Sequence, residues 1–307
     1  RINSHLKMYS FSVIYLFNCT ISMDDFKKIV LFMILPIVSI SFFNISSMPD
    51  LATYHFQPYS NFTTSGGYGP NQVSTLFGLG IVCILTIQVL KTSIFGSKID
   101  LIVLTIFSSL GLITFSRGGI IAAIVSFVLA ISYHMFHDQK KIYIISKGLG
   151  LLAVALFAWF SISSITDGVI SQRYGFSSAS YGEKFMLDLS GRTRIYEIDL
   201  AIFRDHIITG VGPGQADELR HKYGYGKRIS AHTEYSRMLA EHGFFGLFSL
   251  FILLLLPILR FTQNSKRNVK FIKIIFGILG LLTLSHSAMR VAMPSFILAF
   301  LFTTYKD

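Results

Sequence analysis

The chain has 307 residues, of which 52% are hydrophobic and only 14% are charged, whereas soluble domains carry about 25% charged residues. The net charge of +11 does not indicate nucleic-acid binding, because most lysines and arginines flank apolar segments. Charge-free apolar stretches of about 18 residues or more are typical of membrane-spanning helices. The composition therefore predicts an all-α polytopic membrane protein.

The apolar stretches predict about nine spanning helices. They cover residues 6–22, 26–43, 71–90, 99–115, 118–136, 142–160, 244–261, 271–288 and 291–305. They divide the chain into a membrane segment at 1–160, a polar loop at 161–242 and a second membrane segment at 243–307. Lysine and arginine gather in one set of connections, including the one that holds Lys27 and Lys28, and none occurs in 44–70. The first set is therefore predicted to be cytoplasmic, and 44–70 and the polar loop to lie outside.

Two arginines break that pattern. Arg117 and Arg290 fall in very short turns on the predicted outer side. A cation at membrane depth is costly, so each is a functional candidate, and the alternative is an arginine that reaches the lipid headgroups. His286 shares a helical face with Arg290. Asn71 and Gln72 open a span, where they cap the helix or contact a ligand.

The first helix predicted within the polar loop covers 192–206. Ile195, Ile198 and Ile202 form an apolar stripe at helical spacing. Arg194 is placed to pair with Glu197 three residues later. Arg192 has no local carboxylate partner, so it is either a ligand-binding residue or an ordinary solvated arginine.

The segment GVGPG at 210–214 follows this helix. It lacks the GxGxxG spacing of a dinucleotide-binding loop. We expect a tight turn here, with Pro213 opening a short helix that extends to about Tyr223.

A third helix is predicted over 231–242, with Ser230 as its N-cap and Gly243 ending it. That register places His232 in the first turn, where the helix dipole favours a neutral imidazole able to accept a proton. The alternative is a histidine hydrogen-bonded at the membrane interface. Glu234 is expected to pair with Arg237, within reach of Glu241.

Four motifs occur in a fixed order along the chain. They are GPNQVSTLFGLG at 69–80, FSRGG at 115–119, GRTRIYEIDLAIFRDHIITGVGPG at 191–214 and AHTEYSRMLAEHGFFGL at 231–247. Their order and the intervening outer loop resemble the O-antigen ligase and polymerase superfamily. The resemblance covers about 70–260, and the combination is more specific than any single motif.

The resemblance implies a GT-C-like helical fold of about twelve spans with one large periplasmic loop. Three further N-terminal helices would restore that plan, which agrees with a chain that begins at Arg1. It also implies a bacterial inner-membrane enzyme whose active site faces the periplasm. Such an enzyme is an inverting glycosyltransferase that moves a glycan from undecaprenyl diphosphate to an acceptor hydroxyl, with no metal or cofactor.

The family's site residues carry over to matching positions. Arg117 of the SRG motif and Arg192 are expected to bind the diphosphate, and Arg290 joins them on the charge argument above. His232 matches the family's loop histidine and is the expected base. Thr233 departs from the asparagine common at that position, which puts the role of this neighbour in doubt. The further expected substrate contacts are Asn71, Gln72, Glu234, Tyr235 and His286. The site is expected where the loop meets the outer ends of the spans.

Several functions remain open at this stage. A ligase uses lipid A-core or another acceptor, whereas a polymerase extends a growing glycan, and the sequence does not separate them. A transporter of lipid-linked glycan could use the same arginines without catalysis. A structural or sensory membrane protein could use the outer loop to bind a partner. All of these readings involve membrane lipid.

Overall fold

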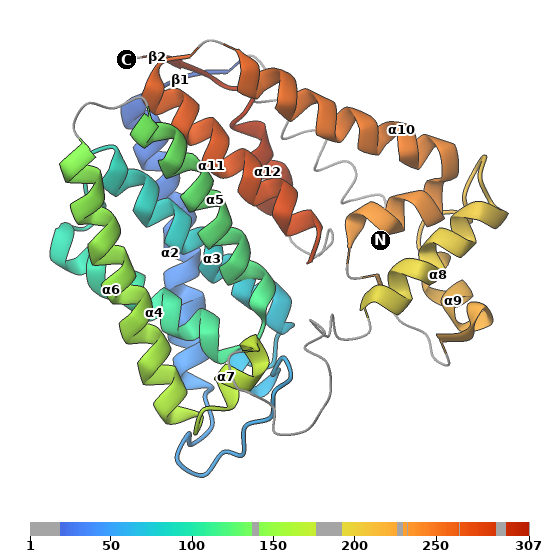
Figure 1. Cartoon of the computed structure of the whole chain (residues 1–307), viewed down its shortest axis with the longest axis horizontal. Helices are drawn as coiled ribbons and strands as arrows, with labels where there is room; N and C mark the ends of the chain where they lie inside the picture. Colours follow the sequence, from blue (N-terminus) through green and yellow to red (C-terminus); the bar gives the residue numbers. More distant parts are fainter. Residues whose placement is uncertain are drawn as a thin grey trace. The chain divides into compact units, whose positions relative to one another are not determined.

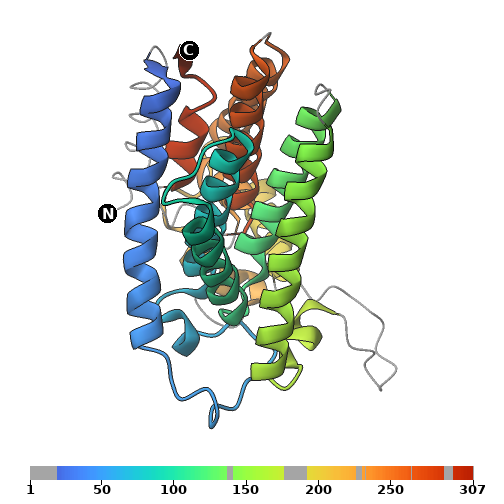
Figure 2. The same cartoon turned by 90° about the vertical axis from the view of Figure 1, so that its left-hand side faces the viewer.

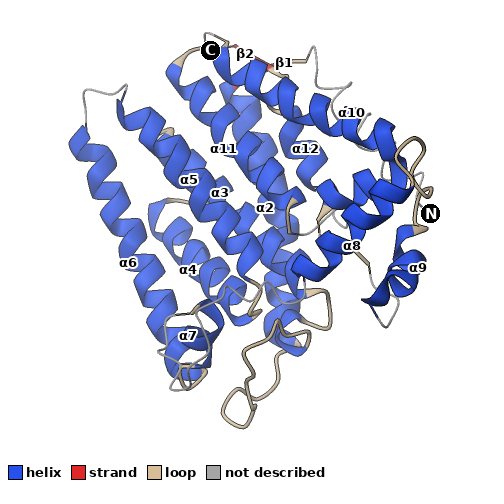
Figure 3. Cartoon of the chain, turned by 45° about the vertical axis from the view of Figure 1, so that its right-hand side comes forward, coloured by secondary structure: helices blue, strands red, loops and turns tan. Residues whose placement is uncertain are grey.

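The computed structural model describes residues 19–136, 141–175, 192–225, 230–231, 233–263, 265–286 and 293–306, with 141–151 described by their backbone. Most of these residues are helical, as Figure 3 shows. Strand in this part of the chain consists of β1 (Thr20–Ser22) and β2 (Thr304–Lys306). The two pair in parallel, with Thr20 opposite Thr304.

The described residues form two compact units. The bundle unit comprises 20–136, 141–175, 265–279 and 304–306, and the loop unit comprises 19, 192–225, 230–231, 233–263, 280–286 and 293–303. The predicted boundaries at 160 and 243 separate membrane from loop segments. The two compact units have different boundaries, because the long helix that follows the polar loop packs on the helices of that loop.

Antiparallel helices make up most of the bundle unit (Figures 1 and 2). They are α2 (Met23–Ser46), α3 (Pro70–Val89), α4 (Ser97–Ile113), α5 (Arg117–Phe136), α6 (Lys141–Ile165) and the short α7 (Val169–Tyr174), with a 3₁₀ turn at Thr63–Ser65. α3 packs most closely on α5 and α4. Pro70 begins α3 because its missing N–H costs nothing at the first helical position.

The loop unit contains several short helices and one long helix. They are α8 (Arg192–Asp205), α9 (Ala216–Arg220), a π turn (His221–Tyr225), α10 (Glu234–Thr262) and α12 (Met293–Ala299). α11 (Arg267–Leu284) contributes residues to both units. Ile198 and Ile202 of the predicted apolar stripe are buried with Ala216 and Ala240, so the stripe is the core face of α8.

Four described helices, α2, α3, α5 and α10, are long and apolar enough to cross a membrane. Large apolar side chains such as Phe42, Leu129 and Phe251 are exposed on these helices, as contact with lipid requires. The all-α membrane class is therefore confirmed. Six of the predicted spans correspond to helices α2 to α6 and α11, and the predicted span 244–261 is the second part of α10.

The two ends of the chain differ from prediction. Most of the predicted span 6–22 lies outside the described residues, and its last residues belong to β1. The prediction of a span over 291–305 is wrong. Its helix, α12, has 7 residues, a rise of only about 10 Å, and the chain beyond it ends in β2. The sequence is apolar here because the segment is buried.

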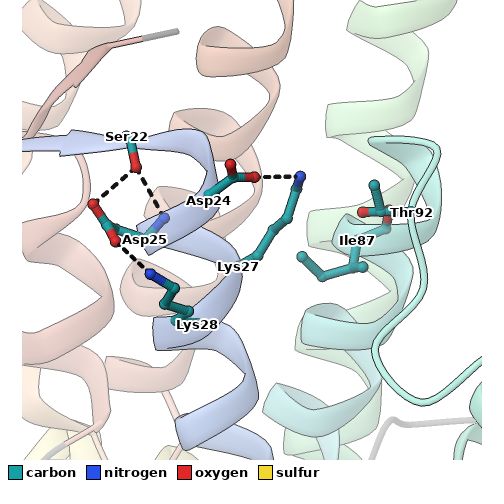
Figure 4. A network of polar contacts seen from close by, with 7 residues as sticks. All are labelled: Ser22, Asp24, Asp25, Lys27, Lys28, Ile87 and Thr92. Carbon is teal, nitrogen blue, oxygen red and sulfur yellow. Dashed lines mark hydrogen bonds and ion pairs between the residues drawn. The ribbon is translucent and has the colours of Figure 1, made fainter.

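The start of α2 shows how one end of the bundle is built (Figure 4). The Ser22 hydroxyl caps the helix by accepting the Asp25 N–H at 3.1 Å. Asp24 then pairs with Lys27 at 2.9 Å, and Asp25 with Lys28 at 3.1 Å. The lysines predicted to be cytoplasmic thus lie in a capped, charge-paired first turn, where carboxylates also suit the helix dipole.

At the opposite end of the bundle, three connections meet. The Asn61 N–H donates to the Thr114 carbonyl at 3.0 Å, which joins the 47–69 connection to the α4–α5 turn. The Arg173 Nε donates to the Phe115 carbonyl at 3.0 Å, which joins α7 to the same turn. These connections were predicted to share one side of the membrane, and the hydrogen bonds place them at one end of the bundle.

Candidate functional site

Arg117 begins α5, directly after a sharp turn at 114–116. Phe115 in that turn has φ 55° and a fully buried side chain. A bulky residue in this backbone region is strained, and it persists only where the surroundings determine it from several sides. Such strain at a charged position is typical of a functional site.

Neighbouring segments hold the turn in place. The Thr64 hydroxyl donates to the Ile113 carbonyl at 2.6 Å, and within the turn the Thr114 hydroxyl accepts the Ser116 N–H at 3.1 Å. The Thr64 and Asn61 bonds satisfy two of the carbonyls left over where α4 ends. The backbone that carries Arg117 is therefore rigidly positioned.

The first turn of α3 supplies further contacts. The Ser116 hydroxyl donates to the Asn71 Oδ1 at 2.7 Å, and the Ser74 hydroxyl donates to the Ser116 carbonyl at 2.8 Å. The Gln72 side chain folds back over Gly69, the N-cap residue of α3, where a Cβ would meet its Oε1 at 1.8 Å. Asn71 thus positions the residue before Arg117, and Gln72 covers the helix start.

Two glycines explain why the motifs around these residues take their form. A Cβ on Gly119 would lie 2.2 Å from the Ser74 carbonyl oxygen, and one on Gly78 would lie 2.5 Å from the Gly119 carbonyl oxygen. α3 and α5 therefore approach backbone to backbone, which only glycine permits. The second glycine of SRGG and the first glycine of FGLG bring Arg117 close to the Asn71 end of α3.

α7 adds two residues that the sequence did not single out. Arg173 reaches the Phe115 carbonyl, and Tyr174 packs on the cluster that contains Phe115 and on Trp159, with ring centroids 5.3 Å apart. Burial raises the pKa of Tyr174, while the charges of Arg117 and Arg173 act to lower it. The phenol therefore stays protonated and can donate. A helix of 6 residues has too little periodicity to be read from sequence.

In the loop unit, three predicted site residues come together near the end of α11. Tyr235 donates its hydroxyl to the Leu281 carbonyl at 2.8 Å. The His286 Nδ1 lies 2.9 Å from the Leu282 carbonyl, and the charge of Arg192 acts on this imidazole. Arg192 begins α8, and His286, on which its charge acts, is distant in sequence.

The start of α10 differs from prediction. α10 begins at Glu234, and Thr233 is the N-cap, its hydroxyl accepting the Tyr235 N–H at 3.3 Å. The prediction that Ser230 caps the helix is wrong, because its hydroxyl donates to Asp217 at 2.8 Å. A helix that begins two residues after His232 does not include it in the first turn, so the helix-dipole argument for a neutral imidazole loses its basis. His232 itself, like Arg290, lies outside the described residues.

The charged residues of α10 pair as predicted. Glu234 is buried and forms an ion pair with Arg237, and Glu241 also acts on the Arg237 charge. The Glu241 carboxylate accepts the Gly214 N–H, which ties α10 to the GVGPG turn.

The GVGPG turn packs against a break in α10. Gly243 has φ 57° and ψ −131°, so the helix is interrupted where the sequence predicted its end. The Val211 N–H donates to the Ala240 carbonyl at 3.0 Å, and the Phe244 N–H to the Ile207 carbonyl at 2.6 Å. A Cβ on Gly210 would lie 2.4 Å from the Glu241 carbonyl. The turn is tight as expected, but the helix after it begins at Ala216 and not at Pro213.

A buried ionic network joins α8, α9 and α10. The fully buried Arg220 bonds Asp199 at 2.7 Å and Asp217 at 2.6 Å. The Ser236 hydroxyl donates to Asp199 at 2.6 Å. Burial raises the pKa of Asp199, and Arg220 and Ser236 oppose that effect. Only the Asp217–Arg220 spacing was readable from sequence, because the other contacts join distant segments.

Comparison with known proteins identifies a family for this chain. The family model described as O-antigen ligase matches residues 101–252, about half of the chain, from α4 to the middle of α10. No curated protein matches the chain. The matched region contains the Arg117 turn, α8 with Arg192, the GVGPG turn and the start of α10. The chain therefore belongs to the O-antigen ligase superfamily, whose members are membrane glycosyltransferases of the ligase or polymerase kind.

Proposed function

We propose that the protein transfers a glycan from undecaprenyl diphosphate to an acceptor hydroxyl, as an O-antigen ligase does. The reaction takes place at the periplasmic face of the bacterial inner membrane. The observation that carries the proposal is Arg117, a cation held by a strained and fully hydrogen-bonded turn at one end of an apolar bundle. The family match over 101–252 supports the same chemistry.

The leaving group determines what the arginines do. Breaking the bond between sugar and diphosphate leaves negative charge on the phosphoryl oxygens. A guanidinium presents a planar set of N–H groups that suits such oxygens, and a preorganised cation stabilises charge as it develops, without a metal. Arg117, Arg192 and Arg290 are the residues proposed for this role.

His232 is proposed as the base that removes the proton from the acceptor hydroxyl. Attack on the sugar carbon from the side opposite the diphosphate inverts the anomeric configuration. The imidazole takes up the hydroxyl proton, and the diphosphate departs with the bonding electrons. Tyr235 and His286, near Arg192, and Glu234, paired with Arg237, are proposed to contact or orient substrate from the loop unit.

The test is transfer by the full chain in nanodiscs, with lipid-linked oligosaccharide as donor and EDTA present. The acceptors are lipid A-core and a second lipid-linked oligosaccharide, which separate ligase from polymerase. His232→Ala should lower the transfer rate by at least about 100-fold, since base catalysis contributes roughly that factor. The matched control is His206→Ala, at an exposed position after α8.

Arg117→Lys should also lower transfer strongly, because a lysine keeps the charge but not the fork. Arg204→Lys, on the exposed end of α8, is its control. Parent rates for both His232→Ala and Arg117→Lys would refute the assigned roles. Movement of lipid-linked glycan across the bilayer, with no acceptor modified, would establish a transporter instead.

A further inference from the structure

We propose that Arg173 and Tyr174 of α7 bind phosphoryl oxygens of the donor beside Arg117, forming an anion subsite from two elements of the bundle unit. The identity of the ligand rests on the proposed function. Anion binding itself does not, because it can be measured without any transfer.

The position of Arg173 is the first support. Its Nε donates to the Phe115 carbonyl at 3.0 Å, two residues before Arg117. That bond orients the guanidinium, whose planar shape suits phosphoryl oxygens. Arg173 therefore approaches the same turn that carries Arg117, from a separate helix.

The Tyr174 hydroxyl is the second support. Its oxygen is buried and has no hydrogen-bond partner among the described residues. Buried polar groups nearly always have partners, and an unsatisfied one requires an explanation. The ring is held on both sides, by Trp159 and by the cluster around Phe115. An oxygen-rich ligand at this place would accept the hydroxyl proton.

The charge of the surroundings indicates the class of ligand. Among the described residues, the charged groups that act on the Tyr174 hydroxyl are Arg117 and Arg173, and both are positive. α5, with 20 residues, also begins at Arg117, so the positive end of its dipole lies at the same place. A phosphoryl group suits two guanidinium groups, a phenol donor and a helix N-terminus.

A purely structural role for α7 accounts for the Arg173 bond but not for the buried hydroxyl of Tyr174. Arg173 could stabilise the strained Phe115 turn through its Nε alone. The buried hydroxyl of Tyr174 contributes nothing to that task, since a phenylalanine would pack equally well. Tyr174→Phe therefore separates ligand binding from support of the turn.

Trp159 provides a direct readout, because it is the single tryptophan of the chain and contacts the Tyr174 ring. Inorganic diphosphate and farnesyl diphosphate are titrated onto the full chain in phosphatidylcholine nanodiscs, and the fluorescence of Trp159 is followed. We expect a saturable change with both ligands. Tyr174→Phe should weaken binding at least about tenfold, as loss of one hydrogen bond to a charged group predicts.

Arg173→Gln should weaken binding more than Tyr174→Phe does, because it also removes a positive charge. Tyr59→Phe is the matched control, an exposed tyrosine on the 47–69 connection, and should bind as the parent does. If Arg173→Gln fails to fold, the affinity of Tyr174→Phe for diphosphate still tests the subsite. Parent affinity in Tyr174→Phe, or no fluorescence change with either diphosphate, would overturn the subsite.

Two further arms separate the sources of phosphate and the two proposals. Nanodiscs with phosphatidylglycerol show whether a lipid headgroup competes, and full competition would overturn a donor subsite. Diphosphate binding that depends on Tyr174, without any transfer, would support the subsite and refute the proposed function. Transfer that depends on Arg117, with Tyr174→Phe binding and transferring like the parent, would refute the subsite alone.

Discussion

The turn before Arg117 and the network around Arg220 hold their surroundings in different ways. Besides the Arg173 bond, the turn is fixed by neutral hydrogen bonds from several segments, among them those of Thr64, Asn71 and Ser74. The network depends on one fully buried guanidinium shared by two carboxylates. Neutral bonds each contribute about 1 kcal/mol net, so the stability of the turn comes from many small contributions. The stability of the network depends on one side chain, whose loss leaves buried charge unpaired.

The largest effect is expected at Arg220. Arg220→Met leaves Asp199 buried without its counter-ion, which costs about 3–5 kcal/mol of unfolding free energy. Hydrogen exchange measured by peptide should show lost protection in α8, α9 and the start of α10. If these helices were protected as well as in the parent, the idea that Arg220 alone stabilises the network would be wrong. Asp199→Asn with Arg220→Met, which removes both charges, should recover part of the loss.

An intermediate effect is expected where α5 meets α3. Gly119→Ala adds a methyl group 2.2 Å from the Ser74 carbonyl oxygen, so the helices must separate. We expect a loss of about 1–3 kcal/mol, typical of overpacking, seen as a lower melting temperature in nanodiscs. Because Ser74 also holds Ser116, transfer should fall as well.

Gly67→Ala is the control for that change. Its φ is +79°, but nothing lies within 4 Å of an added Cβ, so only backbone strain of about 1 kcal/mol applies. Equal melting temperatures for Gly119→Ala and Gly67→Ala would show that Gly119 is not required for the close approach of α3 and α5.

The smallest effect is expected at Arg194. Its ion pair with Glu197 spans 3.8 Å, and the two side chains are 59% and 60% exposed. Arg194→Ala should change the unfolding free energy by less than about 0.5 kcal/mol, as exposed pairs do. If Arg194→Ala melted at as low a temperature as Arg220→Met, burial would not explain why the Arg220 ion pairs contribute more stability than the Arg194 pair.

Local patterns predicted local features well. The apolar stretches located most of the described helices, and Gly243 marked the break in α10. The i,i+3 pairs of Arg194 and Arg237 formed because they require only helical geometry. Competition between equivalent residues was not predictable. Ser230 and Thr233 are both good caps, and the Asp217 carboxylate, distant in sequence, decided between them.

The candidate site was likewise predictable only in part. Arg117 and Arg192 stood out from charge and position alone, because a cation at a span end or a helix start is visible in sequence. Their neighbours were not visible. Arg173 and Tyr174 reach the Arg117 turn from a short helix, and His286 lies near Arg192 from another part of the chain. Such contacts depend on the path of the backbone and not on spacing.

The sequence by itself determined that this is a helical membrane protein with arginines at the ends of apolar segments. Hydrophobic length and charge placement act residue by residue, so they need no knowledge of the fold. Only the tertiary structure decided that Phe115 is strained before Arg117, that Tyr174 buries an unsatisfied hydroxyl beside it, and that 291–305 does not span. Each of these depends on which distant segments come into contact.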